Sequence, residues 1–179
     1  GLMALQLQAQ VLDFAVDLRA TDAQLRGREV LDVAVGPDGL WWLATQDEGV
    51  LRYDGVTLLR TTWSEVPPIV LGVAPVRQGA FAATSDGLFW VPLDGPATPV
   101  AEMSGPVVDV DAHGDTLWVL RPEGLWVRVG GGVFSKQSLD GLGGATQFGR
   151  RGSFWWVAST KGLWVRGGSG FWTRVRDQP

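Results

Sequence analysis

The stretch VAVGPDGLWWLAT at residues 33–45, followed by GVLRYDG at residues 49–55, contains most of what decides the fold. It reads as an apolar strand, a turn, an aromatic-centred strand, a glycine, a third strand and a second turn. The same order recurs three more times along the chain. The glycines that open the third strands recur every 37 or 38 residues: Gly49, Gly87, Gly124 and Gly162. A fixed period in this range indicates a repeat architecture, in which each unit buries its apolar face against its neighbours.

The first strand of each unit is predicted to be the innermost one. The four copies begin at residues 30, 70, 107 and 145. In the first three copies both faces of the strand carry apolar residues, as expected for a strand buried on both sides. Small residues recur at one inward position, as close approach of backbones near a crowded axis requires: Ala34, Ala74 and Gly149.

The second strand of each unit centres on an aromatic residue: Trp41, Phe81, Trp118 and Trp155. We expect these four rings to point the same way within their units and to pack against the neighbouring unit. The glycine that opens each third strand tolerates positive φ, which a tight hairpin between the second and third strands requires. Fourth strands follow the next turn, at residues 56–60, 98–101, 133–136 and 171–175.

Units of four antiparallel strands with a period of about 40 residues are the blades of a β-propeller. The sequence therefore predicts an all-β fold, a β-propeller of four four-stranded blades over residues 30–176, with no helix longer than about two turns after Val30. The expected blades cover about residues 30–62, 70–103, 107–139 and 145–176. The Gly-His and Trp-Asp pairs of WD40 blades and the longer kelch period are missing.

The repeat resembles that of the two-component-regulator propellers, best at residues 33–45 and 49–55. The resemblance covers residues 30–176. The second unit departs most, with Ala80 and Ala82 where bulky residues are expected and Pro75 ending the first strand. The resemblance implies a ligand-sensing or protein-binding platform, and it favours a periplasmic or extracellular location over a cytoplasmic one.

Residues 1–29 are interpreted as an extra N-terminal β segment and connector. Apolar and polar residues alternate through Leu5, Leu7, Ala9 and Val11, which favours strands over the alternative of a helix at residues 5–18. Two strands without a first and second strand would be half a blade. We expect that this segment or another chain covers an exposed blade face, and that the chain is a fragment or subunit of a larger assembly.

Composition argues against several classes of function. The formal net charge of −4 disfavours nucleic acid as a partner, because phosphate binding needs a concentrated basic surface. No apolar run approaches the roughly 18 residues of a membrane span, so no direct membrane insertion is expected. The chain has no cysteine and a single histidine, His113, which argues against thiolate or histidine metal centres and Cys-His catalysis. No metal ion or cofactor is predicted.

Polar residues at matching positions of the inner strands are the candidate ligand-binding site. Asp32 and Asp109 match each other, Gln147 stands at the same place in the fourth unit, and Asp111 follows two residues after Asp109. Converging oxygen atoms in a central channel would bind Ca²⁺ or a small polar ligand. The alternative is that these side chains cap turns or face channel water.

Three tryptophans are the candidate partner-binding residues: Trp42, Trp156 and Trp172. They would form an exposed aromatic docking surface for a protein partner or for self-association, with core packing as the alternative. The predicted function is a non-catalytic scaffold for protein binding or ligand sensing. The competing prediction is an enzyme, such as a carbohydrate-active propeller, that uses paired channel carboxylates about 5–10 Å apart.

Overall fold

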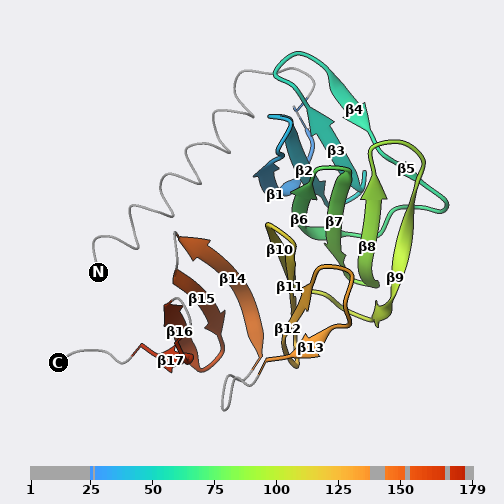
Figure 1. Cartoon of the computed structure of the whole chain (residues 1–179). Coiled ribbons are helices and arrows are strands. Elements are labelled where there is room, and N and C mark those ends of the chain that lie inside the picture. The colour runs from blue at the N-terminus through green and yellow to red at the C-terminus, as the bar shows by residue number, and fades with distance from the viewer. Residues whose placement is uncertain (1–24, 26, 138–143, 152–153, 168–169, 176–179) are drawn as a thin grey trace.

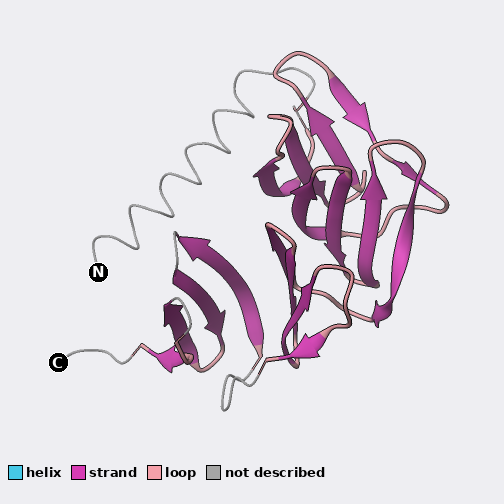
Figure 2. Ribbon diagram, viewed as in Figure 1, coloured by secondary structure: helices cyan, strands magenta, loops and turns pink. Residues whose placement is uncertain are grey.

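Figure 1 shows the computed structural model of the chain, which describes residues 25, 27–137, 144–151, 154–167 and 170–175. Within these ranges the chain forms 17 strands and no helix, as the colouring of Figure 2 shows. The predicted all-β class is therefore confirmed. Almost all of the expected N-terminal β segment lies outside the described residues.

The strands form four small sheets, the four blades of a β-propeller. Blade 1 is β1 (Val30–Val35), β2 (Trp41–Thr45), β3 (Val50–Tyr53) and β4 (Leu58–Arg60). Blade 2 is β6 (Val70–Val76), β7 (Gly79–Thr84), β8 (Gly87–Pro92) and β9 (Pro96–Ser104). Blade 3 is β10 (Asp109–His113), β11 (Thr116–Arg121), β12 (Gly124–Val129) and β13 (Ser135–Lys136). Blade 4 is β14 (Ala145–Arg151), β15 (Phe154–Ser159), β16 (Gly162–Gly167) and β17 (Thr173–Arg174).

One further strand was not expected from the sequence. Strand β5 (Thr62–Trp63) follows blade 1 in the chain but pairs in parallel with β9, so it becomes a fifth, outer strand of blade 2. The ring of Trp63 then lies against Phe89 of blade 2, with ring centroids 5.3 Å apart. This strand connects the outer edges of blades 1 and 2.

The blades follow one another in an arc that begins with blade 1 and ends with blade 4 (Figure 1). The innermost strands contact in chain order, β1 with β6, β6 with β10 and β10 with β14. Three clusters of buried apolar side chains fill the spaces between successive blades. A fourth cluster lies on the other side of blade 1, where Leu25 covers Leu43 and Leu51.

The strand register corrects the predicted positions of the repeated aromatic residues. The small inner-strand residues Ala34, Ala74 and Gly149 lie opposite Trp42, Phe81 and Trp156. In blade 3 the same register places Asp111 opposite Trp118. The equivalent aromatic residues are therefore Trp42, Phe81, Trp118 and Trp156, and the prediction of Trp41 and Trp155 was wrong by one residue. Both errors arise where two tryptophans are adjacent.

The hairpins between the second and third strands are closed in a repeated way. The glycines at the third strands have positive φ in every blade, from 72° at Gly49 to 156° at Gly87. A hydroxyl at the end of the second strand donates to the glycine carbonyl in three blades: Thr45 to Gly49, Thr84 to Gly87 and Ser159 to Gly162. The threonine hydroxyls of blades 1 and 2 also accept hydrogen bonds from turn amides. In blades 1, 2 and 4 this pairing of hydroxyl and glycine ends the hairpin at a defined residue.

Candidate functional site

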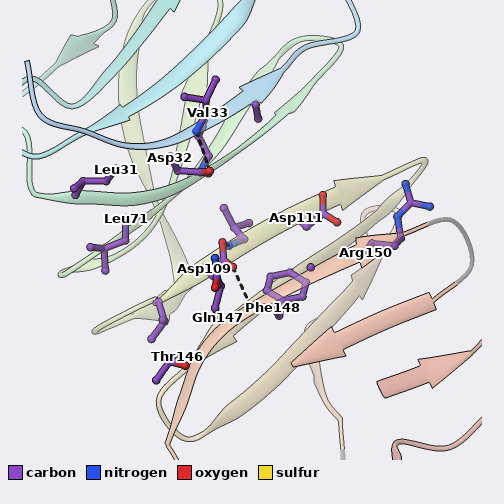
Figure 3. Close-up of a pocket in the computed structure, with 15 residues that line it drawn as sticks. Leu31, Asp32, Val33, Leu71, Asp109, Asp111, Thr146, Gln147, Phe148 and Arg150 are labelled. Carbon is purple, nitrogen blue, oxygen red and sulfur yellow. Dashed lines mark hydrogen bonds between the residues drawn. The ribbon is translucent and has the colours of Figure 1, made fainter. Parts of the chain in front are cut away.

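The innermost strands of all four blades line one cavity of about 540 Å³. Figure 3 shows that its walls come from β1, β6, β10 and β14. All four residues predicted to bind a ligand lie in this lining: Asp32, Asp109, Asp111 and Gln147. The cavity volume falls within the range of about 300–1,000 Å³ found for small-molecule sites.

Asp32 and Asp109 occupy equivalent positions and make equivalent hydrogen bonds. Each carboxylate accepts one bond from the next amide of its own strand, at Val33 and Val110. The second oxygen accepts a bond from the inner strand of the next blade. The Val73 amide donates to Asp32 over 2.9 Å, and the Phe148 amide donates to Asp109 over 3.1 Å. These two side chains therefore connect blade 1 to blade 2 and blade 3 to blade 4, and part of their hydrogen-bonding capacity is already used.

Glycine at the matching position of blade 2 makes room for Asp109. A Cβ atom added to Gly72 would lie 2.8 Å from Asp109 Oδ1. In blade 4 the matching residue is Gln147, whose side chain is exposed at the end of the arc. At this repeat position, blades 1 and 3 thus have a carboxylate that bonds to the next blade. Blade 2 has a glycine that leaves room for Asp109, and blade 4 has the amide of Gln147.

Burial governs the charge of the cavity carboxyl groups. Loss of water contact raises the pKa of Asp109 to about 7, and the neighbouring charges of Asp32 and Asp111 contribute to the rise. Hydrogen bonds from the amides of Phe148 and Val110 favour the ionised form and so act in the opposite direction. Burial also raises the pKa of Asp32 and of Asp111. For Asp111 the Ala112 amide and the Arg150 guanidinium oppose the rise.

Arg150 is the functional candidate that the sequence analysis did not identify. It lies on β14 and lines the cavity together with Asp111 of β10. The guanidinium of Arg150 donates a hydrogen bond to Nδ1 of His113 over 2.9 Å. Its Cζ atom lies 5.6 Å from the centroid of the Trp155 ring. The available signal was a charged residue within a strand predicted to be one of the four innermost strands.

The chemistry of this cavity is that of polar recognition. Asp111 and Arg150 present opposite charges from neighbouring blades, and Gln147 adds an amide that both donates and accepts. Among the residues that the structure describes, no group of three or more His, Cys, Asp or Glu side chains is placed to hold a metal ion. Within the same residues, no helix is long and apolar enough to cross a membrane.

The three candidate partner-binding tryptophans have different surroundings. Trp42 is 1% exposed in the core between blades 1 and 2, so its ring is not accessible to a partner. Trp172 is partly buried and packs against the core between blades 3 and 4. Trp156 lies on the face of blade 4 that points away from blade 3 and is partly exposed. Counting six residues back from Gly87, Gly124 and Gly162 identifies Trp156 as the equivalent of Phe81 and Trp118.

No protein-family model and no curated protein match this chain. Several solved structures are similar. The extracellular domain of a protein described as a one component system from B. thetaiotaomicron has a TM-score of 0.68 and 17% identity, over 84% of this chain and 22% of that one. The extracellular domain of a hybrid two component system from the same organism has a TM-score of 0.62 and 14% identity, over 83% and 25% of the two chains.

A third similar structure is a catalytically inactive variant of virginiamycin B lyase from Staphylococcus aureus, solved with quinupristin. Its TM-score is 0.58 and its identity 10%, over 74% of this chain and 49% of that one. The chain thus spans a quarter or less of the two extracellular domains and about half of the lyase. At these identities the likeness shows the fold. The propeller fold shared with extracellular domains of one- and two-component systems agrees with the resemblance seen in the repeat.

Proposed function

We propose that the chain is a non-catalytic sensing module that binds a small polar ligand in the cavity between its four inner strands. The observation that carries this proposal is the convergence of Asp111, Gln147 and Arg150 on one cavity of about 540 Å³. A carboxylate recognises hydroxyl or ammonium donors, and a guanidinium recognises a carboxylate or another oxygen acceptor. The ligand class is therefore a small molecule that carries both, such as a sugar acid or an amino acid.

The geometry favours binding over catalysis. Asp32 and Asp109 each accept a hydrogen bond from the backbone of the next blade, so movement of either carboxylate towards a substrate would break a bond between blades. One observation supports the competing function of a hydrolase: the pKa of about 7 at Asp109 suits a general acid. Its bonds to Val110 and Phe148 give the same residue a structural role. We therefore place Asp109 in the framework of the site.

The similar extracellular domains also support a sensing role and a periplasmic or extracellular location. In this proposal the ligand draws the inner strands of blades 3 and 4 together, because Asp111 lies on β10 and Arg150 on β14. The proposed output is a change in contacts between blades, transmitted to a protein partner.

A thermal-unfolding screen with sugars, sugar acids and amino acids tests the proposal. A binding compound stabilises the folded chain by about 2.7 kcal/mol at one hundred times its Kd. We expect Asp111→Asn and Arg150→Gln to abolish the stabilisation. The exposed residues Asp94 and Arg77 supply the matched controls Asp94→Asn and Arg77→Gln, which should retain it. Stabilisation that survives both cavity substitutions, or turnover of a glycoside that Asp109→Asn abolishes, would contradict the proposal.

A further inference from the structure

The inner strands of the blades are irregular at the same position of the repeat. The register shifts once in each of β1, β6 and β14, which is the mark of a β-bulge. The residue that lies within each shift is the extra one: Leu31, Leu71 and Thr146. In blade 3 the Val108 amide donates to the carbonyl of Leu120, which also pairs with Asp109, so Val108 has the equivalent place.

The bulges direct two consecutive side chains towards the cavity. Successive residues of a regular strand face opposite sides of the sheet, but a bulge re-aims a side chain. Leu31 therefore lines the cavity together with Asp32. The residues at the same place in blades 2 and 3 line it as well, and we call the three apolar side chains the apolar mouth: Leu31, Leu71 and Val108.

The apolar mouth is accessible from water. Leu31 is 39% exposed and Leu71 is 38% exposed, although both belong to innermost strands. Val108 is partly buried beside them. An apolar group bound here would remove this surface from water, which is favourable in proportion to the area covered.

The opposite end of the cavity is charged. Figure 3 shows Leu31 and Leu71 on one side of the view and Asp111 and Arg150 on the other. Asp111 stands three residues after Val108 in the chain, so the two ends are about 10 Å apart at the rise of a strand.

A middle layer of acceptors lies between these two ends (Figure 3). Each carboxylate oxygen of Asp32 and Asp109 accepts one backbone bond and keeps a second lone pair. The amide of Gln147 adds one more acceptor. This layer can therefore accept N–H donors of a ligand while both carboxylates keep their bonds within and between blades.

We propose that the cavity binds a short peptide with a free carboxylate and an apolar first residue. The peptide carboxylate lies at Arg150, its ammonium and amide donors lie along the middle layer, and its first side chain covers the apolar mouth. The inference rests on the proposed function, because it names the ligand class of the same cavity. The backbone of a dipeptide spans about 7 Å, and a leucine side chain extends this towards the mouth. A sugar acid offers the mouth no apolar group.

Isothermal titration with leucylglycine, glycylleucine, glycylglycine and glucuronic acid tests this order of groups. We expect leucylglycine to bind at least tenfold more tightly than the other three, because only its side chain reaches the apolar mouth. The double substitution Leu31→Ser and Leu71→Ser should weaken leucylglycine binding about tenfold. Leu59→Ser is the matched control, since Leu59 is 44% exposed on β4 and outside the cavity lining. Urea unfolding of each variant checks that the fold is retained.

The inference and the proposed function fail in different ways. If glycylglycine or glucuronic acid binds as tightly as leucylglycine and Arg150→Gln abolishes the binding, the cavity is the site but the apolar mouth does not select the ligand. That result would overturn the inference alone, as would leucylglycine binding that the double substitution leaves unchanged. If no compound binds, or if Arg150→Gln leaves leucylglycine binding intact, both are overturned.

Discussion

The replacement of Asp109 by Asn should remove a defined part of the pH dependence of stability. The pKa of Asp109 rises from its usual 3.8 to about 7 in the folded chain. Below pH 4 the group holds its proton in both states. Between pH 4 and pH 7 the unfolded chain loses this proton while the folded chain keeps it, so the free energy of unfolding decreases as the pH rises. Above pH 7 the contribution of Asp109 is constant.

The magnitude follows from the difference between the two pKa values. At about 1.36 kcal/mol for each pH unit the full difference corresponds to about 4 kcal/mol. The side chain is partly exposed to the cavity, and screening by solvent reduces the expected decrease to about 2–3 kcal/mol. The amide of Asn can accept only one of the two backbone bonds, which costs about 1 kcal/mol at every pH. Asp109→Asn should therefore be less stable than wild type at pH 4 and more stable at pH 8.

Urea unfolding followed by tryptophan fluorescence at pH 4, 5.5, 7 and 8 measures both curves. The matched control is Asp94→Asn, which removes a carboxylate from an exposed turn and should leave the wild-type slope unchanged. Asp32 and Asp111 keep a slope of the same sign in Asp109→Asn, because burial also raises their pKa. Parallel curves for wild type and Asp109→Asn would refute the reasoning. So would a difference between the two curves that moves in favour of wild type from pH 4 to pH 7, since the backbone bonds would then outweigh the cost of burying the Asp109 charge.

Two further substitutions test the packing of the repeat. Gly149→Ala places a Cβ atom 2.5 Å from the Trp156 ring and should lower the free energy of unfolding by about 1–3 kcal/mol; Gly131→Ala, with open space around it, is the control, and equal effects would count against the assigned contact. Thr84→Val removes the buried hydroxyl that closes the hairpin of blade 2 and should cost about 1–3 kcal/mol in urea unfolding. Thr98→Val, on an exposed position of β9, should change stability far less, and a neutral Thr84→Val would show that the hydroxyl is dispensable.

The cavity shows how far a repeat pattern can predict a site. Matching positions in the repeat brought together Asp32, Asp109 and Gln147, and the structure places all three in one cavity with Asp111. Their role as ligand-binding residues stays a prediction. The sequence did not indicate that Asp32 and Asp109 bond to the next blade, because the partner amides lie 41 and 39 residues away.

The sequence by itself determined the all-β class, the number of blades and the place of the inner strands. These features follow from local chemistry: glycines with positive φ recur every 37 or 38 residues, and each is followed by an apolar strand. Such signals depend only on neighbours in the chain, so they can be read without knowing the fold.

Only the tertiary structure decided which of two adjacent tryptophans faces the next blade. A strand alternates with a period of two, so Trp41 and Trp42 face opposite sides, and the pattern alone does not say which side is which. The turn before Gly49 is longer in blade 1 than in the other blades, which moves the count from the glycine by one residue. Pairing of β5 with β9 and the approach of Arg150 to His113 likewise depend on contacts between distant segments. Packing between blades settles these features, because it selects among arrangements that the local sequence allows equally.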